Sequence, residues 1–166
     1  MIYLDNAATT KPCQRALEYA KKFNSEEFFN PSALYRNGLN AFKDVKVAKE
    51  TILKCIGATN HEVIFTASGS ESDNTAIFCS VKRGVFITDN GEHSAVYKCF
   101  KELENRGQKV FYVDLNKDGS VNVNELLNTV KTYGADFVSI MHVNNETGAI
   151  NDVNAIAKQI KNINKN

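Results

Sequence analysis

Apolar side chains recur every three or four residues over one long stretch of the chain, from about Leu34 to Ile56. That spacing places them on one face of a helix, and the glycine that follows, Gly57, is the residue type that most often ends a helix. The sequence therefore predicts a long amphipathic helix over this stretch. The apolar positions are Ala41, Val45, Ala48, Ile52 and Ile56.

Beyond this helix, short runs of β-branched and aromatic residues alternate with stretches of helical spacing. The runs predict strands, and each is followed by a predicted helix with a capping residue near its start. The predicted strands cover residues 62–66, 85–88, 110–113 and 137–141. The predicted helices run from Ser70 to about Val81, from near Ser94 to Gly107, from Asn122 or Asn124 to about Tyr133, and onward from Asp152.

Strands separated by helices of this length imply an α/β fold, with a mostly parallel sheet covered by helices on both faces. In such a sheet, ligands bind beyond the carboxyl ends of the strands. The segments that follow Thr66, Thr88 and Met141 are therefore the places to look for function. Each of them is rich in polar residues.

The composition is that of an ordinary globular domain without a nucleic-acid or membrane partner. Of 166 residues, 43% are hydrophobic and 23% are charged, and 20 basic residues nearly balance 19 acidic ones. No apolar run approaches the roughly 18 residues of a membrane span, and the start of the chain lacks the features of a signal peptide. We therefore expect a cytoplasmic protein whose length suits one domain.

The cysteines give no sign of a disulfide framework or a metal site. Cys13, Cys55, Cys79 and Cys99 are far apart, with no CxxC pair and no histidine at ligand spacing. Such scattered cysteines in a neutral chain are typical of reduced, partly buried thiols.

The loop after the first predicted strand, residues 65–74, has the composition of an anion-binding turn. Its small residues let backbone amides approach an anion, and its hydroxyl groups and the following helix N-terminus supply further donors. An ordinary capped turn explains the same residues equally well, with Ser70 as the N-cap and Asp73 three residues later. The loop matches neither a dinucleotide fingerprint nor a Walker loop.

Two further loops carry side chains suited to a ligand site. His93 stands just before a predicted helix, where an imidazole can stack on an aromatic ligand or move a proton. Asn144 and Asn145 offer amides in a loop that Gly148 allows to turn tightly. Taken singly, each has a simpler interpretation: a capping or solvated histidine, and a polar loop.

Taken together and in order, these loops resemble the NifS-like cysteine desulfurases of the class V aminotransferase group. The resemblance spans essentially the whole chain, and the series of motifs is specific although no single one is. The matching segments are 3–10 (YLDNAATT), 30–32 (NPS), 65–66 (FT), 71–74 (ESDN), 92–96 (EHSAV), Val113, 118–119 (DG), 142–146 (HVNNE) and Gly148.

The resemblance implies a pyridoxal 5′-phosphate (PLP) enzyme with the aminotransferase-like fold type I, usually a homodimer. Residues 1–166 would be the N-terminal portion of its PLP-binding large domain. The implied reaction converts L-cysteine to L-alanine and leaves a persulfide on the enzyme. The persulfide sulfur then passes to a sulfur-acceptor protein, for iron–sulfur clusters or other products.

Site residues carry over from the family by position. Gly69 and Ser70 match the phosphate-contacting pair, and His93 matches the histidine that stacks on the pyridine ring and takes part in acid–base chemistry. Asn145 matches the asparagine near the ring hydroxyl, and Asn30 belongs to a loop near the substrate entrance. The chain departs from the usual family pattern at two places: Ala67-Ser68 replaces Ser-Gly, and Ser70 replaces Thr.

Other parts of the family's machinery are not found in these 166 residues. No lysine lies in the Ser-x-His-Lys context that binds the cofactor covalently, and no residue is a candidate for the aspartate that faces the pyridine nitrogen. None of the cysteines lies in a Ser/Gly-rich loop like that of the family's nucleophile. We expect these groups beyond Asn166, and therefore expect the 166-residue chain alone to be inactive. Another class V enzyme, such as an aminotransferase or a selenocysteine lyase, would share the cofactor site.

A local pattern suggests a different function, calcium binding. Residues Asp114–Glu125 fit the twelve-residue calcium-loop template, with Asp118-Gly119 at its centre. A calcium loop of this kind is entered by a helix, whereas the preceding residues 109–113 are β-branched and aromatic. A strand, a turn around Asp118 and a capped helix explain the segment better.

Overall fold

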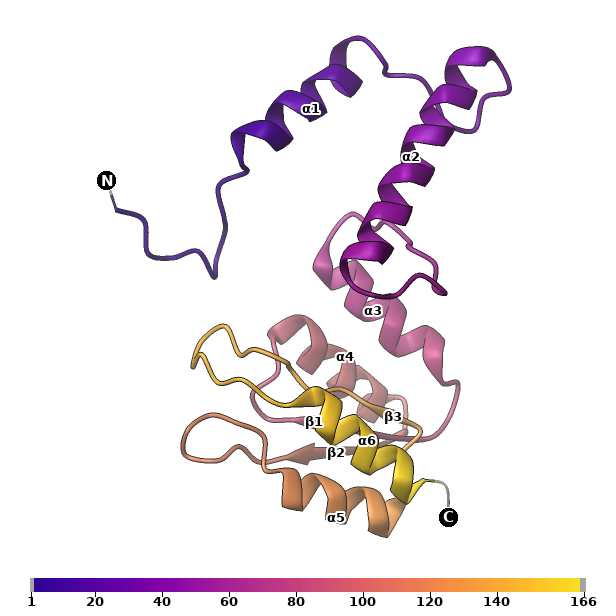
Figure 1. Ribbon diagram of the computed structural model, residues 1–166. Coiled ribbons are helices and arrows are strands. Elements are labelled where there is room, and N and C mark those ends of the chain that lie inside the picture. The colour runs from indigo at the N-terminus through magenta and orange to yellow at the C-terminus, as the bar shows by residue number, and fades with distance from the viewer. Residues whose placement is uncertain (1, 165–166) are drawn as a thin grey trace. The chain divides into compact units, whose positions relative to one another are not determined.

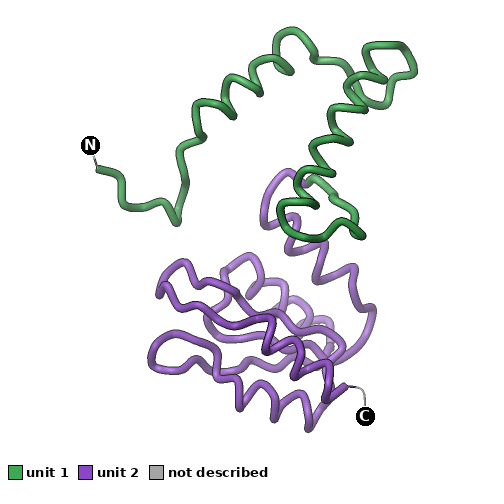
Figure 2. The backbone as a smooth tube through the Cα atoms, in the orientation of Figure 1, with its two compact units in different colours: residues 1–65 green, residues 66–166 purple. Residues whose placement is uncertain are grey.

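The computed structural model describes residues 2–164 and divides the chain into two compact units, Met1–Phe65 and Thr66–Asn166 (Figure 2). Within residues 2–164, no helix is both long enough and apolar enough to cross a membrane. The four cysteines are free thiols, and Cys13, Cys55 and Cys79 are exposed, so the expectation of partly buried thiols was wrong for these three.

The first unit contains two helices. Helix α2 spans Arg36–Cys55 and confirms the predicted long helix, and Gly57 follows it with a φ of +67°, the left-handed conformation expected at a helix end. Helix α1 spans Gln14–Ser25 and was not predicted. Its apolar residues Ala16, Ala20 and Phe23 recur at helical spacing, so the signal was present in the sequence, although no residue of α1 is buried in this unit.

The strand predicted at residues 62–66 is not formed. The segment is without regular structure, and the side chains of Ile64 and Phe65 are 74% and 58% exposed. A strand exists only through hydrogen bonds to a neighbouring strand, and no strand among residues 2–164 pairs with this one. The local sequence favours extended backbone, but without a neighbouring strand this preference does not make it a strand.

The second unit is built on a parallel sheet with β1 in the centre. Strand β1 (Val85–Asp89) pairs in parallel with β2 (Lys109–Val113) on one side and with β3 (Phe137–Val138) on the other (Figure 1). The register aligns Ile87 with Phe111 and Phe86 with Phe137. Strand β3 is shorter than the predicted 137–141, because after Val138 the chain leaves the ladder, although Ser139 N still donates to Ile87 O at 3.0 Å.

Helices cover both faces of this sheet, which confirms the α/β fold. Helices α3 (Gly69–Ser80) and α4 (Ser94–Asn105) lie on one face, and α5 (Val123–Tyr133) and α6 (Val153–Ile163) on the other (Figure 1). Successive side chains along β1 point to opposite faces of the sheet, so β1 contributes to both cores. One core contains Ile77, Phe86, Cys99, Phe100 and Leu103; the other contains Ile87, Val113, Val121, Leu126, Val130 and Ile156.

Each helix of this unit begins at a capping side chain that accepts a hydrogen bond from the first turn. The caps of α3, α4, α5 and α6 are Ser68, His93, Asn122 and Asp152. The prediction for α6 is confirmed, and of the two asparagines considered for α5 the structure selects Asn122. Ser70 as the cap of α3 was wrong by two residues, because Ser68 has the extended backbone of a cap and Ser70 is already helical.

Whether Asn122 or Asn124 caps α5 can be tested by measuring the free energy of unfolding. Asn122→Ala should lower the free energy of unfolding by about 1 kcal/mol, because the bond from Glu125 N to Asn122 Oδ1 (3.2 Å) is lost at the helix start. Asn124→Ala makes the same chemical change two residues later, on an exposed helical position, and should change stability by only a few tenths of a kcal/mol. Urea denaturation of both variants measures this difference, and an equal loss of unfolding free energy in the two would contradict Asn122 as the cap.

Candidate functional site

The parallel sheet brings several loops of the second unit to one edge. The loops after β1 and β3 both leave the carboxyl ends of neighbouring strands, and α4 begins at that edge because it follows β1. Ser70 at the start of α3 and Ser94 and Ala95 at the start of α4 line one open groove of about 430 Å³. The structure therefore brings the Ser70 and His93 segments together.

The start of α3 is a capping box. Ser68 Oγ accepts from Glu71 N at 3.2 Å, and the Glu71 carboxylate accepts from Ala67 N at 2.7 Å. Ser68 stands where the family usually has glycine, yet its φ of −162° and ψ of 162° are extended backbone that any residue adopts. This departure from the family pattern therefore costs the turn no backbone strain.

The capping box leaves three donors of α3 free. Among residues 2–164, the N–H groups of Gly69 and Ser70 and the Ser70 hydroxyl have no acceptor. No atom lies within 4 Å of the place where a side chain on Gly69 would be, so the backbone is open to an approaching group. Free N–H groups at a helix N-terminus, with the positive end of the helix dipole behind them, favour a bound anion.

His93 caps α4 through its ring. Its Nδ1 accepts a hydrogen bond from Ala95 N at 3.2 Å, which fixes Nε2 as the nitrogen that carries the proton in the neutral ring. The side chain is otherwise exposed. The simpler interpretation of His93 as a helix cap is thus confirmed, and it leaves Nε2 and the ring faces free for a ligand.

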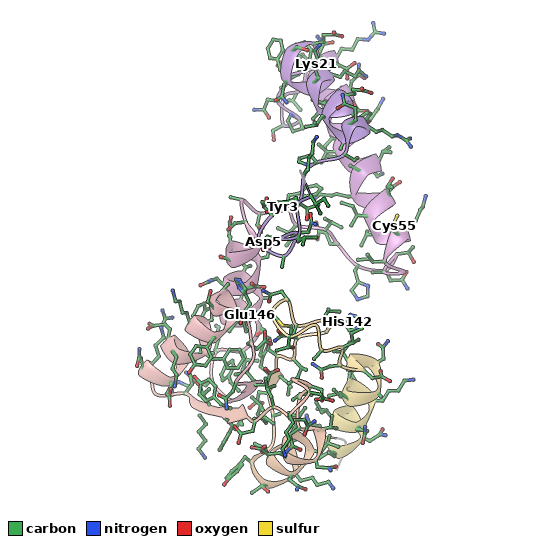
Figure 3. All side chains as sticks on the ribbon, turned by 90° about the vertical axis from the view of Figure 1, so that its left-hand side faces the viewer. Tyr3, Asp5, Lys21, Cys55, His142 and Glu146 are labelled. Atoms are coloured by element: carbon green, nitrogen blue, oxygen red, sulfur yellow. The ribbon has the colours of Figure 1, made fainter. Side chains whose placement is uncertain are left out.

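The loop after β3 is tied to the loop after β1 by the buried side chain of Asn144. Its amide Nδ2 donates to Gly91 O at 2.9 Å, and its Oδ1 accepts from the N–H groups of Glu146 and Thr147, each at 2.9 Å. Figure 3 labels His142 and Glu146 on this loop. Since Asn144 holds the loop from inside, the next residue, Asn145, is exposed, and its amide has no partner among residues 2–164.

Asn30 lies in the first unit, in a turn before α2. Its Oδ1 accepts from Ser32 N at 2.8 Å, and its carbonyl accepts from Ala33 N at 3.0 Å. Gly38 of α2 packs against this turn so closely that an added Cβ would meet Asn30 O at 2.9 Å. Asn30 therefore has a defined local structure within the first unit, and the other site residues belong to the second unit.

The structure adds polar residues at the same edge that the sequence did not single out. Asp89 is only 2% exposed; its Oδ1 accepts from Gly91 N at 2.8 Å, while Oδ2 has no partner among residues 2–164. Glu92 accepts from Ser139 Oγ at 2.7 Å. Asn151, also buried, links the loops after β2 and β3, since it accepts from Val121 N at 2.9 Å and donates to Met141 O at 2.8 Å.

Burial perturbs both acidic groups. The loss of water raises the pKa of Asp89, an effect that the hydrogen bond from Gly91 N only partly offsets. Burial also raises the pKa of Glu92; the Ser139 hydroxyl lowers it, and the negative charge of Asp89 raises it further. Carboxyl groups with raised pKa values beside a ligand-facing edge are typical of functional sites.

The segment that resembles a calcium loop has another structure. Strand β2 enters it in place of a helix, and Leu115 pairs with Val121 in an isolated antiparallel bridge. Its acids are engaged internally: Asp118 Oδ1 accepts from Ser120 N and Oγ at 3.0 and 2.6 Å, and Glu125 accepts from Asp114 N at 3.3 Å. Among residues 2–164, no group of three or more His, Cys, Asp or Glu side chains converges as metal ligands.

The fold and this edge define an α/β protein with free backbone donors at the N-terminus of α3, beside the start of α4. The family model of aminotransferase class-V matches residues 2–165, so the chain belongs to that family. It is 36% identical to a cysteine desulfurase of Nostoc sp. over 97% of this chain and 41% of that protein. It is equally identical to the cysteine desulfurase IscS of Dictyoglomus turgidum, over 96% of this chain and 42% of that protein.

Solved structures agree with this assignment. A NifS-like protein superposes with a TM-score of 0.90 at 33% identity, over 99% of this chain and 46% of that one. The structure described as SspA in complex with cysteine gives 0.84 at 30% identity, over 97% of this chain and 46% of that one. The chain thus has the fold of NifS-like fold type I enzymes and spans less than half the length of these relatives.

The buried carboxyl of Asp89 predicts an unusual pH dependence of stability. Because its pKa is raised in the folded state, its favourable contribution is present below the pKa of an unfolded aspartate, about 3.9, and is lost as pH rises through the folded value. Asp89→Asn removes the charge and keeps an oxygen for Gly91 N. The variant should gain stability relative to the parent as pH rises from acidic to neutral, because it places no charge in this buried position.

Asp118→Asn is the matched control for Asp89→Asn. Hydrogen bonds from Ser120 lower the pKa of Asp118, so its contribution is present at neutral pH and lost as pH falls. The two variants should therefore diverge in opposite directions when melting temperature is measured against pH. A parent-to-variant difference for Asp89→Asn that stays constant with pH would contradict the buried, uncompensated charge.

Proposed function

We propose that this chain is part of a PLP-dependent cysteine desulfurase. The enzyme would move the sulfur of L-cysteine to a protein thiol, which becomes a persulfide, and release L-alanine. The observation that carries the proposal is the set of three free donors at the N-terminus of α3, beside the start of α4 with His93. Cysteine desulfurases at 36% identity support the choice of reaction.

The residues present fit the phosphate end of PLP. Two backbone N–H groups, one hydroxyl and a helix dipole form the kind of donor set that binds a phosphate monoester. Ser70 keeps the hydroxyl of the family's threonine, and the open space around Gly69 lets the phosphate approach the backbone. When bound, PLP supplies an electron sink for bonds at the Cα of the substrate amino acid.

The other residues of the chain would orient the ring and handle a proton. His93 is held at Nδ1 by Ala95 N, so proton transfer at this ring takes place at Nε2, and a face of the imidazole is available for stacking. Asn145, whose amide is free, would donate to the ring hydroxyl oxygen. Gly69 and Ser70 would hold the phosphate, so that ring and phosphate contacts come from different loops.

We propose L-cysteine as the substrate, which the description of the related SspA structure as a complex with cysteine supports. Asn30 would lie near the substrate entrance of the assembled enzyme. A sulfur-acceptor protein, for iron–sulfur clusters or other products, and a homodimeric state complete the proposal. Residues 1–166 would form the N-terminal portion of the PLP-binding large domain, and alone would be inactive, since they hold no Ser-x-His-Lys lysine.

The reaction can be tested on the complete gene product. We expect alanine to form from L-cysteine in a PLP-dependent manner, and His93→Ala to reduce turnover far more than PLP affinity, because proton transfer matters most in the transition state. Release of selenium from selenocysteine without reaction of cysteine would identify a lyase. Amino transfer to a keto acid would identify an aminotransferase.

The contact between Ser70 and the phosphate can be tested by measuring PLP affinity. Ser70→Ala should weaken PLP binding by about 1–3 kcal/mol, the value of one charge-assisted hydrogen bond. Ser80→Ala makes the same change at the other end of α3, where the hydroxyl bonds only to Ile77 O at 3.0 Å, and should leave PLP affinity unchanged. Pyridoxal, which lacks the phosphate, should bind the parent and the Ser70 variant alike. Equal PLP affinity in parent and Ser70→Ala would remove Ser70 from the site.

A further inference from the structure

Glu92 and Ser139 join the loop that carries His93 to the sheet. Ser139 follows β3 directly and is fixed to β1 through its backbone N–H, which donates to Ile87 O at 3.0 Å. Its hydroxyl donates to Glu92 Oε1 at 2.7 Å across 47 positions of sequence. Glu92 immediately precedes His93. A short hydrogen bond to a carboxylate therefore ties the residue next to His93 to the centre of the sheet.

The surroundings of Glu92 make this hydrogen bond important. Glu92 is partly buried, forms no salt bridge within residues 2–164, and lies in the negative fields of Asp89 and Asp73. The groups that favour its charged form are donors, namely the Ser139 hydroxyl and the backbone N–H of His93. A carboxylate in this position depends on those donors, because solvent and cations compensate it only in part.

His93 itself is held weakly. Its ring makes one hydrogen bond, the 3.2 Å bond from Ala95 N to Nδ1, and its backbone has the φ of −57° and ψ of 146° of a residue outside the helix. Gly91, two residues earlier, supplies a backbone without a side chain to restrict it. Asn90 and Gly91 are held by hydrogen bonds to Asp114, Val113, Asp89 and Asn144, whereas the Ser139 hydroxyl is the side-chain donor on Glu92, the residue next to His93.

We propose that Glu92 and Ser139 are positioning residues for His93. Their hydrogen bond fixes the loop conformation in which His93 Nδ1 accepts from Ala95 N and Nε2 remains accessible. The role of His93 towards a cofactor rests on the proposed function, whereas the tether does not. The hydrogen bond matters rather than the charge, since Ser139 needs only an oxygen acceptor at this place. Glutamine can supply that oxygen and alanine cannot.

The tether is tested by NMR of the 166-residue protein without ligand. We expect Ser139→Ala and Glu92→Ala each to shift the Ala95 amide upfield and speed its hydrogen exchange, because the ring leaves its cap. The ring ¹⁵N shifts of His93 should lose the Nε2–H pattern of one tautomer and approach an average of both. Glu92→Gln should restore the parent spectrum, and the double alanine variant should change these signals no more than either single one.

Ser120→Ala is the matched control, since it removes another serine–carboxylate hydrogen bond, to Asp118 at 2.6 Å, and should leave Ala95 and His93 unchanged. Amide signals of β1 report that each variant is folded. Unchanged Ala95 and His93 signals in folded Ser139→Ala, additive effects in the double variant, or Glu92→Gln behaving like Glu92→Ala would each overturn the proposal. Failure of the proposed function is recognised separately, in the complete gene product, as the lack of PLP-dependent formation of alanine from L-cysteine.

Discussion

The pairing of β1 with strands on both sides is the constraint from which the candidate site follows. β1 lies between β2 and β3, and all three run parallel, so their carboxyl ends must meet at one edge. On the same strand, Phe86 packs into one core and Ile87 into the other, so both faces of the sheet are covered by helices. Residues that directly follow these strands therefore lie at the same edge of the sheet, and they need no long-range contacts of their own to be brought there.

Beyond the ends of the strands, side-chain hydrogen bonds replace the sheet ladder. β3 pairs over only two residues, and the loop that follows is held instead by the buried amides of Asn144 and Asn151. Each amide both donates and accepts, so it satisfies backbone groups of two loops at once.

Much of the fold could be predicted from the sequence, because helix periodicity and caps are local properties. α2, α4, α5 and α6 begin and end close to the predicted residues, since each combines an apolar stripe with a capping residue or a final glycine. The prediction of a strand at 62–66 was wrong because a strand depends on a hydrogen-bonded partner strand, which the local sequence does not encode. α1 was missed although Ala16, Ala20 and Phe23 recur at helical spacing, so the local sequence did contain the signal.

The parallel-sheet rule predicted ligand-facing segments after Thr66, Thr88 and Met141, but no strand forms before the first of them. The resemblance named Gly69, Ser70, His93 and Asn145, whose roles stay predictions, and the internal contacts of this edge could not be predicted. The Glu92–Ser139 hydrogen bond and the role of Asn144 depend on residues about fifty positions apart. Such pairs follow from the tertiary structure, and neither residue type nor spacing indicates them.

The central claim is that the N-terminus of α3 binds the phosphate of PLP beside His93. The most direct measurement is the change of backbone amide chemical shifts when PLP is added to the protein, mapped residue by residue. The account predicts that the amides of Gly69 and Ser70 shift strongly and those at the far end of α3 do not. Shifts confined to regions near surface lysines, with Gly69 and Ser70 unmoved, would contradict it.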